Sequence, residues 1–134
     1  MKKHYKVSLV LACIVTLLIT AFLIVRNQES QKPYKFLTSA AQQQFGDKIG
    51  ESRQGMTDCY PMGTGKTSCP SLIYTVSEKE CLNALSTFKD AAADKESCSD
   101  NRLDFKYQGH QVKTYIGEGN NNDYWVKVFL EEDL

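Results

Sequence analysis

The sequence lacks an excess of charge of either sign, because 16 Lys and Arg residues balance 16 Asp and Glu residues. A chain without a basic balance gains no bulk electrostatic attraction for nucleic acid, so we expect no nucleic-acid partner. The bias of disordered or collagen-like chains is also absent, since 42% of the residues are hydrophobic and 24% are charged. With 134 residues, the chain has room for one folded domain and not for two.

Motifs typical of redox, metal or nucleotide chemistry are missing or incomplete. The sequence has no Cys-x-x-Cys pair, and its cysteines and histidines lack the close spacing of a zinc site. Residues 63–67 (GTGKT) resemble the end of a phosphate-binding loop, but Tyr60 stands where that motif needs its first glycine. Residues 120–123 (NNND) lack the alternating spacing of a calcium-binding loop. We therefore expect no nucleotide, no metal and no other cofactor.

One long apolar run is present at residues 7–25, which contain no charged residue, glycine or proline. A helix of that length measures about 28 Å, which is close to the thickness of the hydrocarbon core of a bilayer. Lys2, Lys3 and Lys6 precede the run, and Arg26 follows it. We predict that residues 7–25 form an uncleaved transmembrane signal anchor.

Two alternatives compete with the signal anchor. The apolar region of a cleaved signal peptide typically spans about 7–15 residues, and no pair of small residues follows Arg26 to form a cleavage site. Residues 10–13 (VLAC) resemble the lipobox of bacterial lipoproteins, and this resemblance implies that Cys13 is lipidated and becomes the mature N-terminus. The apolar run continues well past Cys13, which favours an ordinary cysteine inside a transmembrane helix.

Basic residues and cysteines predict which side of the membrane the folded domain occupies. The basic tail at residues 1–6 favours the cytoplasm under the positive-inside rule. Four of the five cysteines follow the anchor, and that density in a small domain suits an oxidising compartment. We therefore expect a single-pass cell-membrane protein with a cytoplasmic tail (1–6), a transmembrane anchor (7–25), a polar tether (26–32) and an extracytoplasmic domain (33–134).

Residue periodicity predicts the elements of the outer domain. Leu37, Ala41 and Phe45 recur every four positions, which indicates an amphipathic helix that ends at Gly46. The segment SEKE at 77–80 has the spacing of a capping box, which starts a second amphipathic helix. Alternation of apolar and polar residues predicts strands elsewhere. The expected elements are a helix at 33–45, a weak strand at 49–59, a strand at 71–76, a helix at 78–92, and strands at 103–107, 112–116 and 124–130.

This order, α-β-β-α-β-β-β, predicts the fold class. It closes most simply as an α+β domain of two layers, with helices packed on one face of a mainly antiparallel sheet. The predicted architecture is an N-terminal transmembrane helix followed by that domain. A domain of about 100 residues has a modest core, so we expect disulfides to reinforce it.

The four outer cysteines allow three pairings. Cys59 and Cys69 flank a short segment and can meet across a hairpin, so we favour this pair, which leaves Cys81 with Cys98. The second pair is awkward, because a helix over 78–92 measures about 22 Å and the few residues after it must span that length. A Cys69–Cys98 pair therefore stays open as the alternative.

Candidate binding residues come from the last strand and from one loop. Trp125 and Phe129 alternate with apolar residues of the last strand, so they point to the opposite face of the sheet. If the helices cover only one face, these two residues are exposed together with Tyr115, and exposed aromatic residues are enriched in binding sites. The alternative is that the first helix covers them. Lys66 is a further candidate contact, because it lies in the loop between the first two outer cysteines.

No catalytic constellation appears in the sequence, so the expected function is binding or assembly in a cell-envelope complex, with a protein partner. An enzyme with a scattered active site is the first alternative, and its candidate residues are His110, Asp104 and Lys113. The second alternative is a pilin-like structural subunit that polymerises through its apolar N-terminal helix. The sequence lacks a pilin-like cleavage site and the glutamate of the pilin helix.

Overall fold

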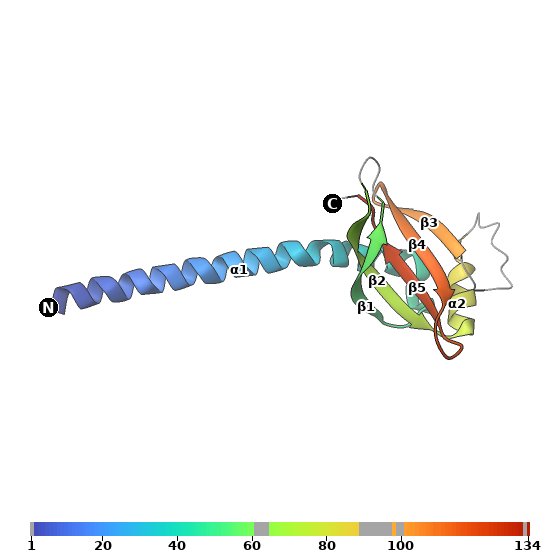
Figure 1. Ribbon diagram of the computed structural model, residues 1–134, viewed down its shortest axis with the longest axis horizontal. Helices are drawn as coiled ribbons and strands as arrows, with labels where there is room; N and C mark the ends of the chain where they lie inside the picture. Colours follow the sequence, from blue (N-terminus) through green and yellow to red (C-terminus); the bar gives the residue numbers. More distant parts are fainter. Residues whose placement is uncertain (1, 61–64, 89–97, 99–100, 133) are drawn as a thin grey trace. The chain divides into compact units, whose positions relative to one another are not determined.

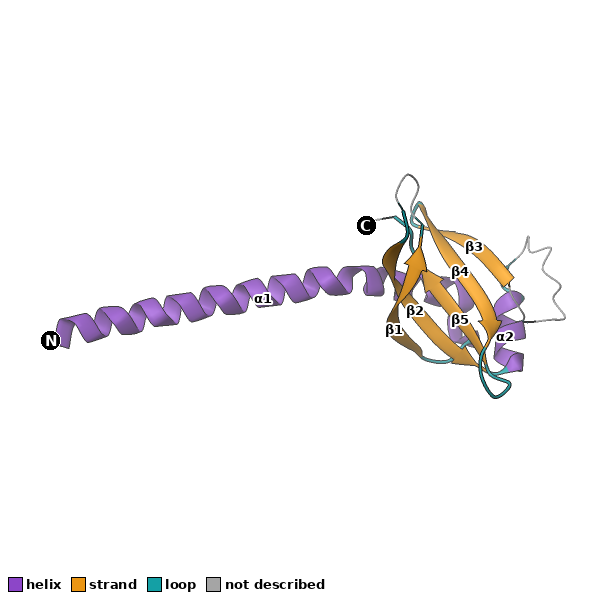
Figure 2. Ribbon diagram, viewed as in Figure 1, coloured by secondary structure: helices purple, strands orange, loops and turns teal. Residues whose placement is uncertain are grey.

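The computed structural model combines a long N-terminal helix with a five-stranded antiparallel sheet and a short helix (Figure 1, Figure 2). This α+β layout confirms the fold class that the sequence predicts. Contacts divide the chain into two compact units, Met1–Lys32 and Pro33–Leu134. The structure describes residues 2–60, 65–88, 98, 101–132 and 134.

Helix α1 runs from Lys2 to Phe45. The polar tether predicted at residues 26–32 is helical instead, because Gln, Glu and Lys are good helix formers and no glycine interrupts them. Pro33 lies inside the helix, although a proline removes one backbone hydrogen bond. Gly46 follows with a φ of 58°, a left-handed conformation that glycine adopts readily at the end of a helix.

The first unit carries the apolar run of α1. Its large side chains are exposed, and Leu17 and Leu18 reach 70% and 65% exposure. The helix is long and apolar enough to cross a membrane. Side chains of this kind need an apolar environment, which a bilayer supplies.

The sheet holds five strands in the order β1-β2-β5-β4-β3, and every neighbouring pair is antiparallel. The last strand along the chain therefore lies at the centre. Gln108 and Gly109 connect β3 to β4 with φ angles of 48° and 82°, which are typical of a tight hairpin turn. The strands are β1 (Ser52–Cys59), β2 (Thr67–Val76), β3 (Asn101–Tyr107), β4 (His110–Glu118) and β5 (Tyr124–Phe129).

Strand β2 begins at Thr67, earlier than the strand predicted at 71–76. The reason is its partner, because β1 pairs with β2 without interruption from Ser52↔Tyr74 to Cys59↔Thr67. The predicted weak strand at 49–59 is this partner. Its alternation is poor because most of β1 is exposed on both faces, as is usual for the edge of a sheet.

Helix α2 (Glu78–Leu85) starts at the capping box. The Ser77 N–H donates to Glu80 Oε2 at 2.8 Å, and the Glu80 N–H donates to the Ser77 hydroxyl oxygen at 3.4 Å. The backbone N–H and then the hydroxyl of Ser77 hold the pKa of the Glu80 carboxyl below its usual range, since both donate to its charged form.

Helix α2 ends at Leu85, whereas periodicity predicts a helix as far as residue 92. The hydroxyls of Ser86 and Thr87 each donate at 2.7 Å to a carbonyl three residues earlier, and such bonds compete with the helical pattern. The backbone tightens at the same point, because the Thr87 and Phe88 N–H groups also bond three residues back. Residues 89–92 of the predicted helix lie outside the described residues.

Two disulfides join the outer cysteines. Cys59 and Cys69 are bonded across β1 and β2, with their Cα atoms 5.9 Å apart. Cys81 and Cys98 are bonded with a Cα separation of 6.1 Å. This second pair is possible because α2 ends early, so the chain need not return along a helix of the predicted length. The alternative pair, Cys69 with Cys98, does not occur.

The core lies between the helices and one face of the sheet. The end of α1 and the buried side of α2 cover this face, and Figure 2 shows both helical segments behind the strands. Phe45 is 1% exposed and contacts Phe88 and Phe105 at ring distances of 5.8 and 6.1 Å. The remaining buried core residues on the helices and the central strands include Leu37, Ala40, Ala41, Leu72, Tyr74, Val76, Ala84, Leu85, Val112, Ile116, Val126 and Val128.

Replacing Phe45 with Ala should remove the centre of this aromatic cluster. We expect a loss of about 3–5 kcal/mol in the free energy of unfolding, because the ring leaves a cavity that the packed sheet cannot close. Urea unfolding of the full-length protein in detergent, followed by circular dichroism, measures the change. Tyr60→Ala is the matched control, since Tyr60 is 62% exposed and its loss should cost at most about 0.5 kcal/mol. Equal effects of the two substitutions would contradict the burial of Phe45 at the centre of the aromatic cluster.

Candidate binding site on the open sheet face

The face of the sheet opposite the helices is called the open face here, because the buried helix residues pack on the other side. Strand pairing places one row of residues across all five strands of this face. The row alternates positive with apolar or aromatic side chains. From one sheet edge to the other it contains Arg53, Ile73, Lys127, Tyr115 and Arg102.

Trp125 lies next to this row and is fixed by four contacts. Its ring is stacked on Tyr115, with a centroid distance of 5.1 Å and an interplanar angle of 15°. Its Nε1–H donates to the Glu118 carbonyl at 3.0 Å. The Lys127 ammonium lies 5.1 Å from the centroid of the indole, within the range of a cation–π contact. The fourth contact is with Gly117 on the neighbouring strand.

Gly117 makes room for the indole. It pairs directly with Trp125, and a Cβ at this position would overlap with the benzo ring of Trp125. Gly55 pairs with Ser71 and makes room for Ile73 from a diagonal position, because a Cβ at Gly55 would lie 2.8 Å from the Ile73 Cδ1 atom. Each glycine therefore lets a side chain of the open face lie against the neighbouring strand. Aromatic and apolar side chains held in this way form a preorganised surface.

The open face carries positive charge that carboxylates do not neutralise. The Arg102 guanidinium lies 5.0 Å from the centroid of the Tyr115 ring. Within the described part of the chain, no ion pair involves Arg102, Lys127 or Arg53. Lys113 differs, because its ammonium lies 3.1 Å from the Asp104 carboxylate. Three cations on this face are thus available to an anionic ligand.

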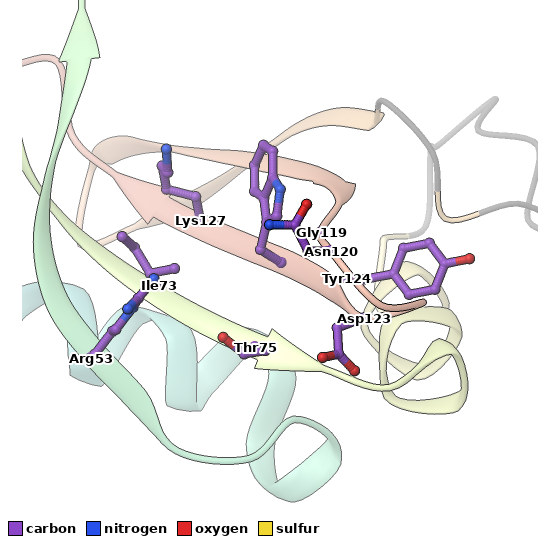
Figure 3. Close-up of a pocket in the computed structure, with 9 residues that line it drawn as sticks. Arg53, Ile73, Thr75, Gly119, Asn120, Asp123, Tyr124 and Lys127 are labelled. Carbon is purple, nitrogen blue, oxygen red and sulfur yellow. The ribbon is translucent and has the colours of Figure 1, made fainter.

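A cavity of about 310 Å³ opens on this face between β2 and the end of the β4–β5 hairpin (Figure 3). Arg53, Ile73 and Lys127 reach it from three neighbouring strands, as Figure 3 shows. Its volume is at the lower end of the range that small-molecule sites occupy. The other lining residues are Thr75, Gly119, Asn120, Asp123, Tyr124 and Trp125.

The residues that the sequence singles out for binding are distributed over more than one place. Trp125 lines the cavity, and the Tyr115 ring is stacked on the indole of Trp125. Phe129 is on the same face, but it lies in the row next to the row of Tyr115. There it pairs with Ser71, which is buried. Lys66 bonds to Asp58 at 2.8 Å and does not line the cavity, and this bond raises the pKa of Lys66.

Sequence reasoning missed the cations of the row. Arg53 lies in a strand with poor alternation, and the alternation of the last strand places Lys127 on the face opposite the core without marking it as a contact residue. Their proximity depends on the strand order, because β1 and β5 flank β2 although they are far apart in the sequence. A further motif, residues 63–67, includes positions 63 and 64, which lie outside the described residues.

The scattered residues of the enzyme hypothesis form two separate pairs. Asp104 accepts hydrogen bonds from Lys113 and Gln111 on the open face. His110 instead lies 3.8 Å from the Glu132 carboxylate, and its ring contacts Phe36 at 5.3 Å. Among the described residues, no group of three or more His, Cys, Asp or Glu side chains is arranged to hold a metal ion.

Comparison with known proteins assigns no family, since no family model, curated protein or solved structure matches the chain. The function has to be inferred from the chain's own residues. What they form on the open face is an aromatic and positively charged surface with a cavity, and such a surface is suited to binding.

Gly117→Ala should displace the indole of Trp125, because the added methyl group occupies the same space. We expect a shifted emission spectrum from Trp125, which is the single tryptophan of the chain, and a loss of about 1–3 kcal/mol in stability. Gly65→Ala is the control, since a Cβ at Gly65 meets no atom within 4 Å. Fluorescence of both variants in detergent checks the expectation, and an unchanged spectrum for Gly117→Ala would show that Trp125 is not held in this way.

Proposed function

We propose that this protein is a single-pass membrane protein whose domain binds a component of the cell envelope outside the cytoplasm. Residues 7–25 act as an uncleaved anchor with the N-terminus in the cytoplasm, and residues 33–134 form the binding module. The open face is the binding surface. The observation that carries the proposal is the fixed position of Trp125, held by four contacts beside a cavity and beside three cations that form no ion pair with the described residues.

The chemistry of the two units supports this arrangement. The exposed apolar side chains of α1 between 7 and 25 need a bilayer, and the cysteines of the second unit are bonded in two disulfides. Disulfides of this kind persist in oxidising compartments and are rare in the cytosol. The basic residues before the anchor favour the cytoplasmic side for the N-terminus.

The location has a direct chemical test. In denatured membranes isolated without any reductant or thiol-blocking reagent, we expect a maleimide-polyethylene glycol reagent to leave Cys59, Cys69, Cys81 and Cys98 unlabelled until a reductant is added. Gel mobility of the full-length protein reports the number of labelled thiols. A Cys13→Ser variant is the matched control, because it removes the one cysteine that forms no disulfide. Complete labelling without reductant, or recovery of the protein in the soluble fraction, would refute the location.

Binding at the open face is tested by placing a photoreactive residue at Thr75. Thr75 is exposed and lines the cavity, so a benzophenone side chain there should form an adduct in intact membranes. The control places the same group at Lys79, an exposed position in the first turn of α2. We expect an adduct from Thr75 alone. No adduct at Thr75, or equal adducts at both positions, would contradict a binding function for this face.

A pilin-like structural subunit is the second candidate, and one observation favours it. Helix α1 continues without a break from Lys2 to Phe45, so the apolar run and a core-forming segment belong to one helix. In this candidate, the apolar segments of neighbouring copies pack against one another in the membrane. Crosslinking in native membranes distinguishes this candidate, because recovery of monomers alone would eliminate it.

A further inference from the structure

We infer that the cavity on the open face binds an acidic sugar unit, namely a uronic acid of an extracellular polysaccharide. This inference names the ligand of the surface described above, so it rests on the proposed function. It is carried by the opposite chemistry of the two ends of one cavity. Figure 3 shows the labelled side chains of Arg53 and Lys127 on strands that flank Ile73.

The basic end of the cavity is suited to a carboxylate. Arg53, Ile73 and Lys127 occupy the same register row, with Ile73 on the strand between the two cations. Strands are about 4.8 Å apart, so the two cationic residues start about 10 Å from each other and their long side chains can converge on one anion. Neither cation has a carboxylate partner among the described residues. Ile73 supplies an apolar floor between them.

The other end of the cavity is suited to hydroxyl groups. Thr75, Asn120 and Asp123 line it, and their oxygens accept hydrogen bonds from neutral donors. The Asp123 carboxylate repels a ligand that is negative throughout, such as inorganic phosphate or a nucleic-acid strand. A ligand that satisfies both ends therefore carries one carboxylate and several hydroxyl groups, as a uronic acid does.

The row beyond the cavity extends the site along a polymer. Arg102 lies two strands past Lys127, with Tyr115 between them, so a second positive position follows the Arg53–Lys127 pair about 10 Å further along the row. That spacing is close to the length of a disaccharide with one carboxylate. Nucleic acid places its charges about 3.4 Å apart along each strand, which is much denser. An extended peptide presents side chains on one face at multiples of about 6.7 Å, which does not match the row.

Trp125 reports binding directly, because it lines the cavity and is the single tryptophan of the chain. The full-length protein in detergent is titrated with a hyaluronan hexasaccharide, in which glucuronic acid alternates with N-acetylglucosamine. We expect a saturable change in Trp125 emission. Chitohexaose, which is neutral, and inorganic phosphate should give no change at the same concentrations.

Two substitutions connect this signal to the cations. Arg53→Gln and Lys127→Gln should each weaken binding about tenfold or more, since each removes a charged hydrogen bond to the carboxylate. Lys79→Gln removes an equal charge from the helix side and should leave the affinity unchanged. Lys127 contacts the indole whose emission is measured. The affinity of the Lys127→Gln variant is therefore also measured by calorimetry, which does not depend on fluorescence.

Each result separates the acidic-sugar inference from the function on which it rests. Equal binding of chitohexaose, of phosphate or of an oligonucleotide would overturn the acidic sugar, as would wild-type affinity in both Gln variants. If no sugar binds but Thr75 still forms its adduct in membranes, the inference fails and the proposed binding face stands. If neither occurs, both fail. Selective binding that both Gln variants lose supports the assignment.

Discussion

The one-sided burial of the sheet is the constraint on which the rest of the structure depends. Only the end of α1 and the two short turns of α2 are available to cover strands in the described part of the chain, and both pack on the same face. Phe45 and its aromatic neighbours fill the space between them. The opposite face must therefore be stabilised by its own side chains, which explains why its aromatic rings lie against glycines and beneath cations.

The stabilisation of the open face by its own side chains has a chemical consequence for the site. Arg102 and Lys127 are held by aromatic rings, and no carboxylate of the described residues forms an ion pair with them, so their charge is positioned without being neutralised there. Trp125 is held from several sides and loses little further freedom when a ligand arrives. The same contacts that stabilise an uncovered sheet thus leave a preorganised surface on it. The membrane-anchored binding module that we propose follows from this combination.

Much of the fold could be predicted from short sequence patterns, because such patterns reflect interactions between residues that are close in the sequence. The four-residue repeat through Phe45 and the capping box at Ser77 report interactions within one or two helical turns, and both occur as expected. The predicted end of α2 is wrong, because apolar periodicity continues past Leu85. The helix ends there since the hydroxyls of Ser86 and Thr87 donate to carbonyls three residues earlier and compete with the helical pattern. The helical conformation of residues 26–32 could not be predicted, because polar composition alone does not distinguish a solvated linker from a solvated helix.

The candidate site could be predicted only in part. Alternation along one strand places Trp125 opposite the core, but nothing in the sequence brings Arg53 and Lys127 to the same cavity. That neighbourhood comes from the position of β5 at the centre of the sheet, which is long-range information.

The central position of β5 also determines when the domain can form. The hairpins β1–β2 and β3–β4 share no strand pairing with each other in the described sheet, and residues 124–129 join them. A nascent chain that has not yet released these residues from the ribosome holds two hairpins and no continuous sheet. The pairing of β5 with β4 is local in the sequence, whereas its pairing with β2 is distant, so the β2–β5 contact is the slow, non-local one that completes the sheet.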